Sequence, residues 1–392
     1  MEALLSPFAR SLAPPTSLSP LPFDLNAGVP DRESLPAAAL AEAARAALLE
    51  DPGGALTYGG AQGFEPLRAW IAERHATETG QPVTSAEVTI TTGSAHAIDN
   101  IAATFVGPGD VVIVGAPSYP GAIRTFRARG ARLVDVPQDD DGLRVDALKA
   151  TLAALRTAGT PAKLLYVVSN YDNPSGSTLP EARRRALVDV ARRHRVLVIE
   201  DDAYTGIDLD GPPLPSLSEI GGGEGVLRVG SFSKIVATGL RVGWIVGERP
   251  LIDRLVFMRF DNGSSPFVQR TLLHYLRSGA HEPHLVRLQS IYRERRDVSA
   301  AGLRECCEPY VTFRPPAGGF FHWLRLRPGL DAAAVTAAAA RQGVAVTPGT
   351  GYFANGGGED RVRLVYSALP PPALREAIAR FGRALEEVAG VR

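Results

Sequence analysis

The sequence lacks the residues and patterns that mark several classes of protein. It has two cysteines in 392 residues, the adjacent Cys306 and Cys307. Neighbouring thiols alone can build neither a disulfide framework nor a zinc site, so both are excluded. The 42 basic residues equal the 42 acidic ones. This balance gives no indication of a protein that binds nucleic acid or a membrane surface.

Long hydrophobic runs are also missing. No apolar run in the sequence approaches the ~20 residues that a membrane-spanning helix needs. The first 20 residues contain neither the basic segment nor the apolar segment of a signal peptide. We therefore expect a cytoplasmic protein with no membrane partner and no nucleic-acid partner.

From about residue 36 to about residue 250, short β-rich runs alternate with amphipathic helical stretches. Runs that are apolar on both faces and joined by helices predict a mainly parallel sheet in an α/β domain. The seven predicted strands lie at 88–92, 110–115, 131–137, 163–169, 195–200, 225–230 and 242–247. The helical stretches between them lie at 95–106, 120–129, 144–157 and 180–194.

The pattern changes after about residue 250. Two long helical stretches at 266–278 and 282–307 are followed by strands mixed with helices, which predicts a smaller α+β domain. We expect three parts along the chain. They are an N-terminal arm at 1–35, a large domain at 36–270 and a small C-terminal domain at 271–392.

The stretch "GSFSKIVATGLRVGW" places Lys234 beside Ser231 and Ser233 where an apolar run ends, with Arg241 seven residues later. Open α/β sheets bind ligands at the edge where such strands end. Burial there would favour a neutral amine, which condenses with aldehydes. The hydroxyls and the arginine suit a phosphate. Together they indicate a Schiff-base site for pyridoxal 5'-phosphate (PLP), the alternative being a surface lysine in a turn.

Two further strand ends carry polar groups that such a cofactor needs. "VLVIEDDAY" ends a strand at Asp201, and a carboxylate beside the pyridine nitrogen keeps that nitrogen protonated. "SNYDNPSG" ends another strand with Asn173, a donor for the 3'-oxygen. A solvated turn or a metal pair is the alternative for Asp201 and Asp202. No histidine or further acid accompanies them, which disfavours metal.

The remaining strand ends offer an anion site and an aromatic face. "TTGSAHAID" opens a helix at Ser94 and Ala95, where free backbone N–H groups can bind phosphate. "GAPSYPG" supplies Tyr119, which could stack on a flat ring. An ordinary helix cap and a partly buried tyrosine are the corresponding alternatives.

In their order and spacing, these motifs resemble the fold-type I PLP enzymes of aminotransferase class I/II. The subgroup that the chain resembles most contains the 2-aminoadipate/lysine-type aminotransferases and the aminotransferase domains of GntR-like regulators. The resemblance runs from "NAGVPD" to the end of the chain. It implies a mainly parallel seven-stranded sheet in the PLP-binding domain and ping-pong transfer of an amino group from an α-amino acid to a 2-oxo acid.

The resemblance also implies roles for individual residues. Lys234, Asp201 and Tyr204 would be catalytic. Arg363, Gly28 and Asn173 would bind the substrate, with the choice of Arg363 over Arg361 resting on the family alignment. Tyr58 would reach the cofactor of a neighbouring subunit, which implies a homodimer with shared active sites. The implied cofactor contacts are Tyr58, Ser94, Ala95, Tyr119, Asn173, Asp201, Tyr204, Ser231, Ser233, Lys234 and Arg241.

The chain departs from the subgroup at two places near the cofactor. Asp172 stands where glutamine is usual, and Ala95 and His96 follow "GS" where the subgroup has a glutamine. These departures keep an alternative function open, a PLP enzyme of specialised metabolism that performs elimination, replacement or cyclisation at the β or γ carbon. A non-enzymatic regulator is a third possibility. It is disfavoured because only about 35 residues precede the core.

Overall fold

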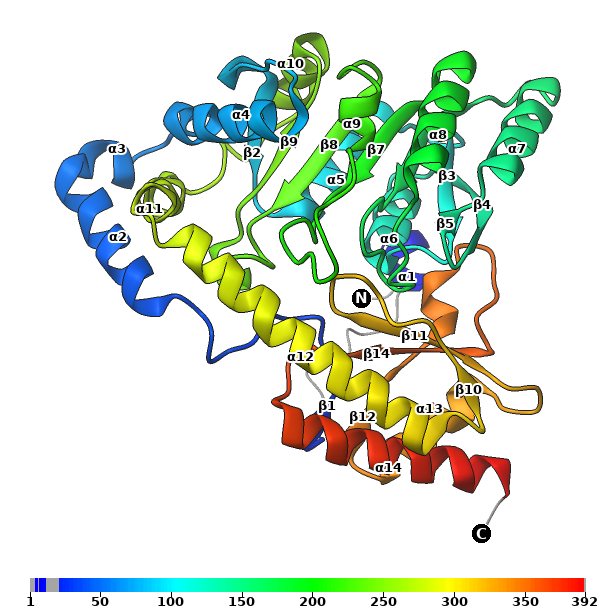
Figure 1. Cartoon of the computed structure of the whole chain (residues 1–392). Helices are drawn as coiled ribbons and strands as arrows, with labels where there is room; N and C mark the ends of the chain where they lie inside the picture. The colour runs from blue at the N-terminus through cyan, green and yellow to red at the C-terminus, as the bar shows by residue number, and fades with distance from the viewer. Residues whose placement is uncertain (1–3, 6, 12–20, 391–392) are drawn as a thin grey trace.

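The computed structural model describes residues 4–5, 7–11 and 21–390. Part of the expected arm, residues 1–3, 6 and 12–20, lies outside the described residues. An eight-stranded sheet forms the centre of the large domain, in the order β2-β9-β8-β7-β6-β3-β4-β5 (Figure 1). Among the described residues, no helix is both long and apolar enough to cross a bilayer.

All seven predicted runs are strands of this sheet, and a two-residue strand at one edge makes the eighth. The middle of the sheet is parallel, in the series β4-β3-β6-β7-β8. Strand β9 is antiparallel to both β8 and β2, and the short strand β5 is antiparallel to β4. The mainly parallel sheet is thus confirmed. Its strands are β2 (Val88–Thr91), β3 (Val111–Ala116), β4 (Arg132–Asp139), β5 (Gly142–Leu143), β6 (Ala162–Val167), β7 (Leu197–Asp201), β8 (Val226–Ser231) and β9 (Gly243–Val246).

Helices cover both faces of the sheet because its central strands are apolar on both sides. One buried cluster joins the sheet to α5, α6 and α10, and another joins it to α7, α8 and α9. The predicted helical stretches of this region are all present. The helices are α5 (Ser94–Phe105), α6 (Pro120–Ala128), α7 (Val145–Thr157), α8 (Glu181–His194), α9 (Leu217–Ile220) and α10 (Arg249–Phe257).

The C-terminal part is built on an antiparallel sheet with the order β10-β11-β14-β13. The expected arm takes part in this region, because Phe23 and Asp24 of β1 pair in parallel with Val344 and Ala345 of β12. The strands are β1 (Phe23–Asp24), β10 (Val311–Thr312), β11 (Phe321–Leu326), β12 (Val344–Ala345), β13 (Thr347–Pro348) and β14 (Arg361–Val365). The helices are α12 (His281–Cys307), α13 (Ala332–Arg341) and α14 (Pro371–Ala389).

The long helix α12 runs from the large domain to α14 at the far end of the molecule (Figure 1). Helices α2 and α3 form the opposite corner beside α11 (Figure 1). The remaining elements are α1 (Pro7–Ser11), α2 (Ala37–Glu50), α3 (Pro52–Leu56), α4 (Glu65–Thr79), α11 (Pro266–Arg277) and the 3-10 turns η2 (Ser85–Glu87), η3 (Thr238–Leu240) and η4 (Gly349–Tyr352).

This topology brings separate sequence motifs to one edge of the sheet. Parallel strands β3, β6, β7 and β8 all end there. Strand β2 ends at the same edge, because Thr91 and Ser231 both pair with Gly243. The loops after these strands therefore face a common space, as expected for a ligand site in an α/β sheet.

Candidate active site

A cavity of about 290 Å³ lies at this edge, between the large sheet and the C-terminal part. Every predicted site residue except Tyr58 lines it, and Tyr58 is 88% exposed on the surface of the single chain. The cavity also has lining residues that the sequence analysis did not identify. These are Tyr166, Val168, Ala203, Thr238 and Phe321.

Lys234 presents an amine that is less basic than that of an ordinary lysine. Its Nζ donates a hydrogen bond to the Gly28 carbonyl oxygen at 2.6 Å. Burial, followed by the positive charges of Arg363 and Arg241, lowers the pKa of Lys234 to about 8. Near neutral pH more of this side chain is therefore the free amine than in an ordinary lysine, and the free amine is the form that attacks a carbonyl carbon.

Asp201 offers a buried carboxylate oxygen with no partner. Its Oδ2 accepts a hydrogen bond from the Tyr166 hydroxyl at 2.6 Å, whereas its Oδ1 is buried and has none. Burial is the main cause that raises the pKa of Asp201 to about 6. A buried polar atom without a partner is costly, so Oδ1 suits a ligand that brings a proton donor into the cavity.

The next residue along the strand end is engaged elsewhere. Asp202 forms a buried ion pair with Arg228, with 2.6 Å between Oδ2 and Nη2. It also accepts hydrogen bonds from Asn170 and Thr205. Asp202 is therefore not available to bind a metal ion together with Asp201. Of these two carboxylates, only Asp201 lines the cavity.

The loop before α5 and the Arg241 side chain form an anion site. The first bonds of α5 run from His96 and Ala97 to the Gly93 carbonyl, so the N–H groups of Ser94 and Ala95 are left for a ligand. Gly93 has φ +80°, and a Cβ there would lie 2.5 Å from Arg241 Nη2. The close approach of backbone and guanidinium produces the cradle that a phosphate needs.

Two serines complete this anion site. Ser231 Oγ accepts from the Ser233 N–H at 3.1 Å, and Arg241 Nη1 donates to Ser233 Oγ at 3.4 Å. Both serines are almost fully buried. Arg241 itself adopts a left-handed backbone conformation, with φ 52°. For a residue with a side chain this conformation is unusual, and such outliers concentrate at functional sites.

Arg363 lies on the opposite wall of the cavity, on β14. Its Nη1 donates to Asn173 Oδ1 at 2.9 Å, and its Nη2 donates to the Asn26 carbonyl at 2.6 Å. Its Nε is buried without a partner. Arg361 instead forms an ion pair with Asp360 at 2.8 Å and does not line the cavity. The geometry therefore distinguishes the two arginines that the sequence alone could not separate.

Aromatic rings form the rest of the wall. Tyr119 and Tyr204 line the cavity, and the Tyr204 ring makes edge contacts with Phe320 and Phe321 at 5.7 and 5.5 Å between centroids. Gly28 lies where a Cβ would come within 3.1 Å of the Phe321 ring. A side chain at position 28 would thus press on the Phe321 ring, which would have to shift by a few tenths of an ångström.

The two departures from the subgroup pattern have different surroundings. Asp172 is buried directly before Asn173. His96 is partly exposed on the first turn of α5. Its Nδ1 accepts from the Thr92 N–H at 3.1 Å, and its Nε2 lies 3.8 Å from Asp261 Oδ2. Burial lowers the pKa of His96, which favours the neutral ring.

Tyr166 is the residue at this site that sequence reasoning missed most clearly. It lies inside the apolar run "KLLYVVS", where a tyrosine reads as a core residue. Its pairing with Ile199 on β7 places its hydroxyl near Asp201. One sequence signal could have identified Tyr166: its hydroxyl lies near the carboxyl end of a buried strand, and the next strand along the chain ends in an acidic residue, Asp201.

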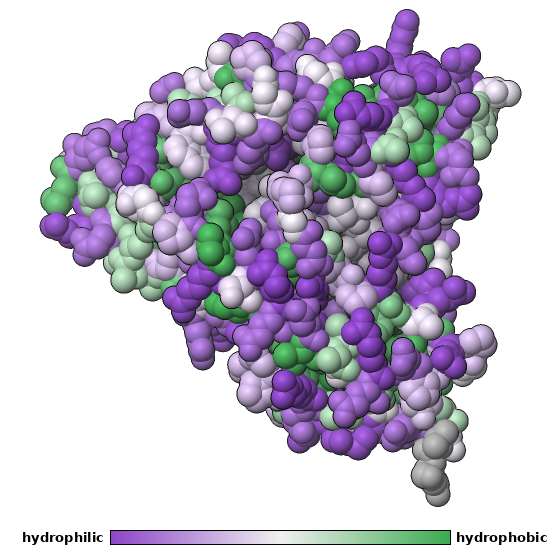
Figure 2. Space-filling view, in the orientation of Figure 1, coloured by the Kyte–Doolittle hydropathy of each residue, from purple (hydrophilic) through white to green (hydrophobic). Residues whose placement is uncertain are grey.

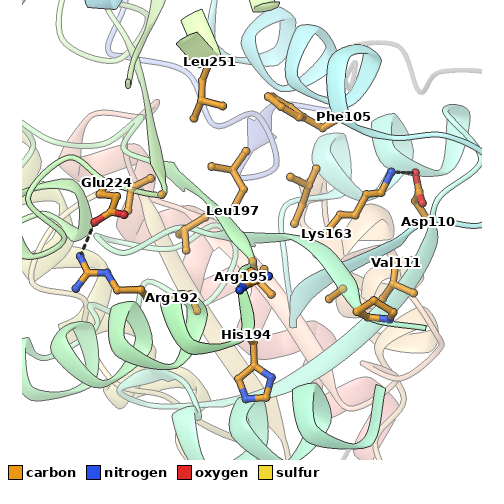
Figure 3. Close-up of a pocket in the computed structure, with 18 of the residues that line it drawn as sticks. Phe105, Asp110, Val111, Lys163, Arg192, His194, Arg195, Leu197, Glu224 and Leu251 are labelled. Atoms are coloured by element: carbon orange, nitrogen blue, oxygen red, sulfur yellow. Dashed lines mark hydrogen bonds and ion pairs between the residues drawn. The ribbon is translucent and has the colours of Figure 1, made fainter. Parts of the chain in front are cut away.

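A larger groove of about 1110 Å³ lies at the other, amino-terminal edge of the sheet (Figure 3). Its charged residues are largely paired, with Lys163 Nζ 2.6 Å from Asp110 and Arg192 3.8 Å from Glu224. No predicted site residue lines it. Among the described residues, none of the buried polar atoms that lack a partner belongs to this groove. The chemistry therefore belongs to the smaller cavity.

The family model for "Aminotransferase class I and II" matches residues 22–381. The chain belongs to this family. The aminotransferase is 31% identical to the aromatic-amino-acid aminotransferase 1 of Thermococcus litoralis. The match covers 93% of this chain and 88% of the relative. It is 35% identical to the 2-aminoadipate transaminase of Thermus thermophilus, and this match covers 92% of the chain and 89% of the relative. These matches confirm the family resemblance.

The structural comparison agrees. The crystal structure of the Pyrococcus horikoshii kynurenine aminotransferase in complex with PMP, 28% identical, superposes with a TM-score of 0.93 over 98% of each chain. The chain is thus a fold-type I aminotransferase, a PLP-dependent transferase that acts on an amino acid. The residues present fit the cofactor, because Asp201 Oδ1 lacks a partner and the α5 N-terminus lies against Arg241.

Proposed function

We propose that the aminotransferase holds PLP in the cavity at the carboxyl edge of the sheet. Lys234 would carry it, Asp201 would accept from its ring nitrogen, and Tyr204 and Asn173 would bond its 3'-oxygen. The remaining contacts would be ring stacking by Tyr119 and phosphate binding by Ser94, Ala95, Ser231, Ser233 and Arg241. The single observation that carries this proposal is that the unpartnered Asp201 Oδ1 belongs to the same cavity as the weakly basic Lys234.

When bound, PLP supplies an electron sink for the bond-breaking at the substrate's α-carbon. Lys234 Nζ would take the α-proton from the substrate and would later give it up again. It can do both because its pKa of about 8 lies close to neutral pH. Asp201 holds the ring-nitrogen proton, and Tyr166 keeps the Asp201 carboxylate oriented by its 2.6 Å hydrogen bond.

Arg363 would bind the substrate α-carboxylate. Its guanidinium donates hydrogen bonds to Asn173 Oδ1 and to the Asn26 carbonyl, and its Nε has no partner. A carboxylate satisfies an arginine fork with two parallel hydrogen bonds. Gly28 lies at the same wall, and its carbonyl bonds to Lys234. Substrate binding would thus place the α-carbon between Arg363 and Lys234.

The proposal is tested by the first half of a ping-pong cycle. The PLP-loaded protein is mixed with single α-amino acids in the absence of any 2-oxo acid. We expect at least one amino acid to convert the cofactor stoichiometrically to pyridoxamine phosphate, followed by absorbance, with release of the matching 2-oxo acid. Failure of the whole proteinogenic set would contradict the proposal, and loss of the substrate side chain would instead indicate elimination.

We also propose that the aminotransferase is a homodimer in which each subunit completes the other's site. Tyr58 supports this, because it is 88% exposed although the family resemblance assigns it to a cofactor phosphate. Leu49 and Leu56 are exposed on the same corner, and Figure 2 shows hydrophobic side chains at the α2–α3 end of the molecule. An apolar surface with a tyrosine at its edge fits burial against a second copy.

The shared site predicts complementation between two defective chains. Tyr58→Phe alone should weaken PLP binding by roughly 10- to 100-fold, the worth of one hydrogen bond to a charged group. Mixed dimers of Tyr58→Phe and Lys234→Ala chains should recover one intact site per dimer, with native PLP affinity and about half the native activity per dimer. If each subunit used its own Tyr58, no mixed dimer would contain an intact site, which would contradict the proposal.

The domain boundaries at residues 35 and 270 and the cytoplasmic location stay predictions. Pairing of β1 with β12 supports treating the start of the described chain separately from the large domain. Helix α12 begins at His281, close to the proposed second boundary.

A further inference from the structure

Arg363 is a buried cation with no acidic partner. Its residue is 8% exposed, and none of the ion pairs between described residues involves it. Its hydrogen bonds go to neutral oxygens: Asn173 Oδ1 at 2.9 Å, the Asn26 carbonyl at 2.6 Å and Thr347 Oγ1 at 3.5 Å. Burial of a charge without a counter-charge is costly, so other contacts must offset the cost at this position.

Two aromatic rings lie against the Arg363 guanidinium. Its Cζ is 4.7 Å from the centroid of the Phe321 ring and 5.3 Å from the centroid of the Tyr352 ring. Both rings are buried, with exposures of 1% and 2%. An aromatic ring attracts a cation over its face, and more strongly where water is excluded. The rings therefore offset the burial of the charge without neutralising it, whereas an acidic side chain would compete with a substrate carboxylate.

The register of the small sheet explains why only one arginine of β14 has this environment. Arg363 lies opposite Trp323 on β11 (Figure 1). Phe321 is two residues before Trp323, so both side chains lie on the same face of the sheet. Arg361 lies opposite Arg325, farther along the strand. Among the described residues, no aromatic ring lies against the Arg361 guanidinium, so the rings distinguish Arg363 from its neighbour on β14.

Tyr352 is held in place by contacts other than Arg363. It ends the turn η4 and does not line the cavity. Its carbonyl accepts a hydrogen bond from the Ser118 N–H at 2.7 Å. Its ring makes an edge contact with the Trp323 ring, with 5.5 Å between centroids and 73° between planes. These contacts fix both the backbone and the ring of Tyr352, so the ring is a fixed support for the guanidinium.

We propose that Phe321 and Tyr352 form an aromatic clamp, which holds the Arg363 guanidinium in place as an unpaired cation for the substrate α-carboxylate. The inference rests on the proposed role of Arg363. Tyr352 is then a positioning residue, because it lies outside the cavity and acts through Arg363. Loss of its ring should weaken binding of the carboxylate more than it slows the reaction.

The test follows the first half-reaction of the PLP-loaded protein at increasing concentrations of the amino acid that reacts fastest in the panel described above. This measurement separates an apparent Kd from a limiting rate. Tyr352→Leu removes the ring and keeps an apolar side chain. We expect its apparent Kd to rise about 10-fold, as for loss of a desolvated cation–ring contact, with a limiting rate within about threefold of native. Tyr352→Phe keeps the ring and should stay close to native in both.

Phe313→Leu is the matched control for loss of a ring. Phe313 also lies beside an arginine, with Arg304 Cζ 5.9 Å from its ring centroid, but this pair is outside the cavity. The control should leave the apparent Kd unchanged. A native apparent Kd in folded Tyr352→Leu, or an equal rise in Phe313→Leu, would overturn the inference.

A double-mutant cycle separates an effect through Arg363 from a general effect on packing. Tyr352→Leu should raise the apparent Kd in the native background and cause no further rise in the Arg363→Gln background. Equal rises in both backgrounds would overturn the aromatic clamp alone. An unchanged apparent Kd in Arg363→Gln itself would contradict the proposed carboxylate site, and the clamp with it. If Tyr352→Leu does not fold, Phe321→Leu takes its place in the cycle with the same expectation.

The melting temperature of the cofactor-free protein gives a readout that does not depend on catalysis. Because the rings offset the burial of a charge, Tyr352→Leu should lower the melting temperature more when Arg363 is present than in the Arg363→Gln background. Equal decreases in the two backgrounds would show that the Tyr352 ring only fills space, and would contradict the inference.

Discussion

Replacement of Lys234 by alanine should lower transaminase activity by about 10⁴-fold or more, since a single proton-transfer group already contributes ~10²–10⁴-fold. The variant loses both the covalent anchor and the base, and no other lysine lines the cavity among the described residues. The fold should survive, because the amine makes one hydrogen bond, to Gly28, and lies in a cavity. Steady-state kinetics and circular dichroism measure the two effects.

The matched control is Lys163→Ala. Lys163 is exposed at the amino-terminal edge of the same sheet and pairs with Asp110. Its removal should leave kcat/KM unchanged and cost at most ~1 kcal/mol in the free energy of unfolding, the worth of a surface ion pair. If Lys234→Ala kept more than a hundredth of the native rate, Lys234 would not be the group that moves the proton.

Replacement of Arg363 by glutamine should lower kcat/KM for the amino acid by about 10²- to 10³-fold. The reason is the loss of two charge-assisted hydrogen bonds to the α-carboxylate, each worth ~1.5–3 kcal/mol before the glutamine recovers part of the contact. PLP affinity should change less than kcat/KM, because the proposed phosphate contacts, Ser94, Ala95, Ser231, Ser233 and Arg241, do not include Arg363.

Arg361→Gln is the control for this prediction. Arg361 lies two residues away on β14 and pairs with Asp360, outside the cavity. The Arg361→Gln variant should retain native kcat/KM. A larger loss in Arg361→Gln than in Arg363→Gln would reverse the assignment. A loss of the carboxylate contact should also appear as weakened binding of substrate carboxylates to the PLP-loaded protein, measured without turnover.

Much of the fold was predictable because its signals are local. Most of the seven apolar runs are buried on both faces of the sheet and are therefore β-rich over their whole length, as in "VVIVGA" of β3, whereas β4 is only partly buried. The site was predictable to a similar extent because strand ends in one parallel sheet meet at one edge. Lys234, Asp201 and Ser94 are far apart in the sequence and still line one cavity.

The remaining features depend on contacts that no local pattern encodes. Pairing of Phe23 with Val344 joins the two ends of the chain. The hydroxyl of Tyr166 acquires its role only from the register of β6 against β7. The choice of Arg363 over Arg361 depends on which side chain of β14 reaches the cavity. The partner proposed to bury Tyr58 is a second subunit, and a single sequence carries no spacing that specifies it.

The central claim is that the Lys234 amine, with its pKa lowered to about 8, carries the cofactor. The most direct measurement is borohydride reduction of the PLP-saturated protein, followed by proteolysis and mass spectrometry of the peptides. The account predicts a pyridoxyl group on the peptide that contains Lys234 and none in the Lys234→Ala variant. A label on another lysine, or no label in protein that has bound PLP, would contradict it.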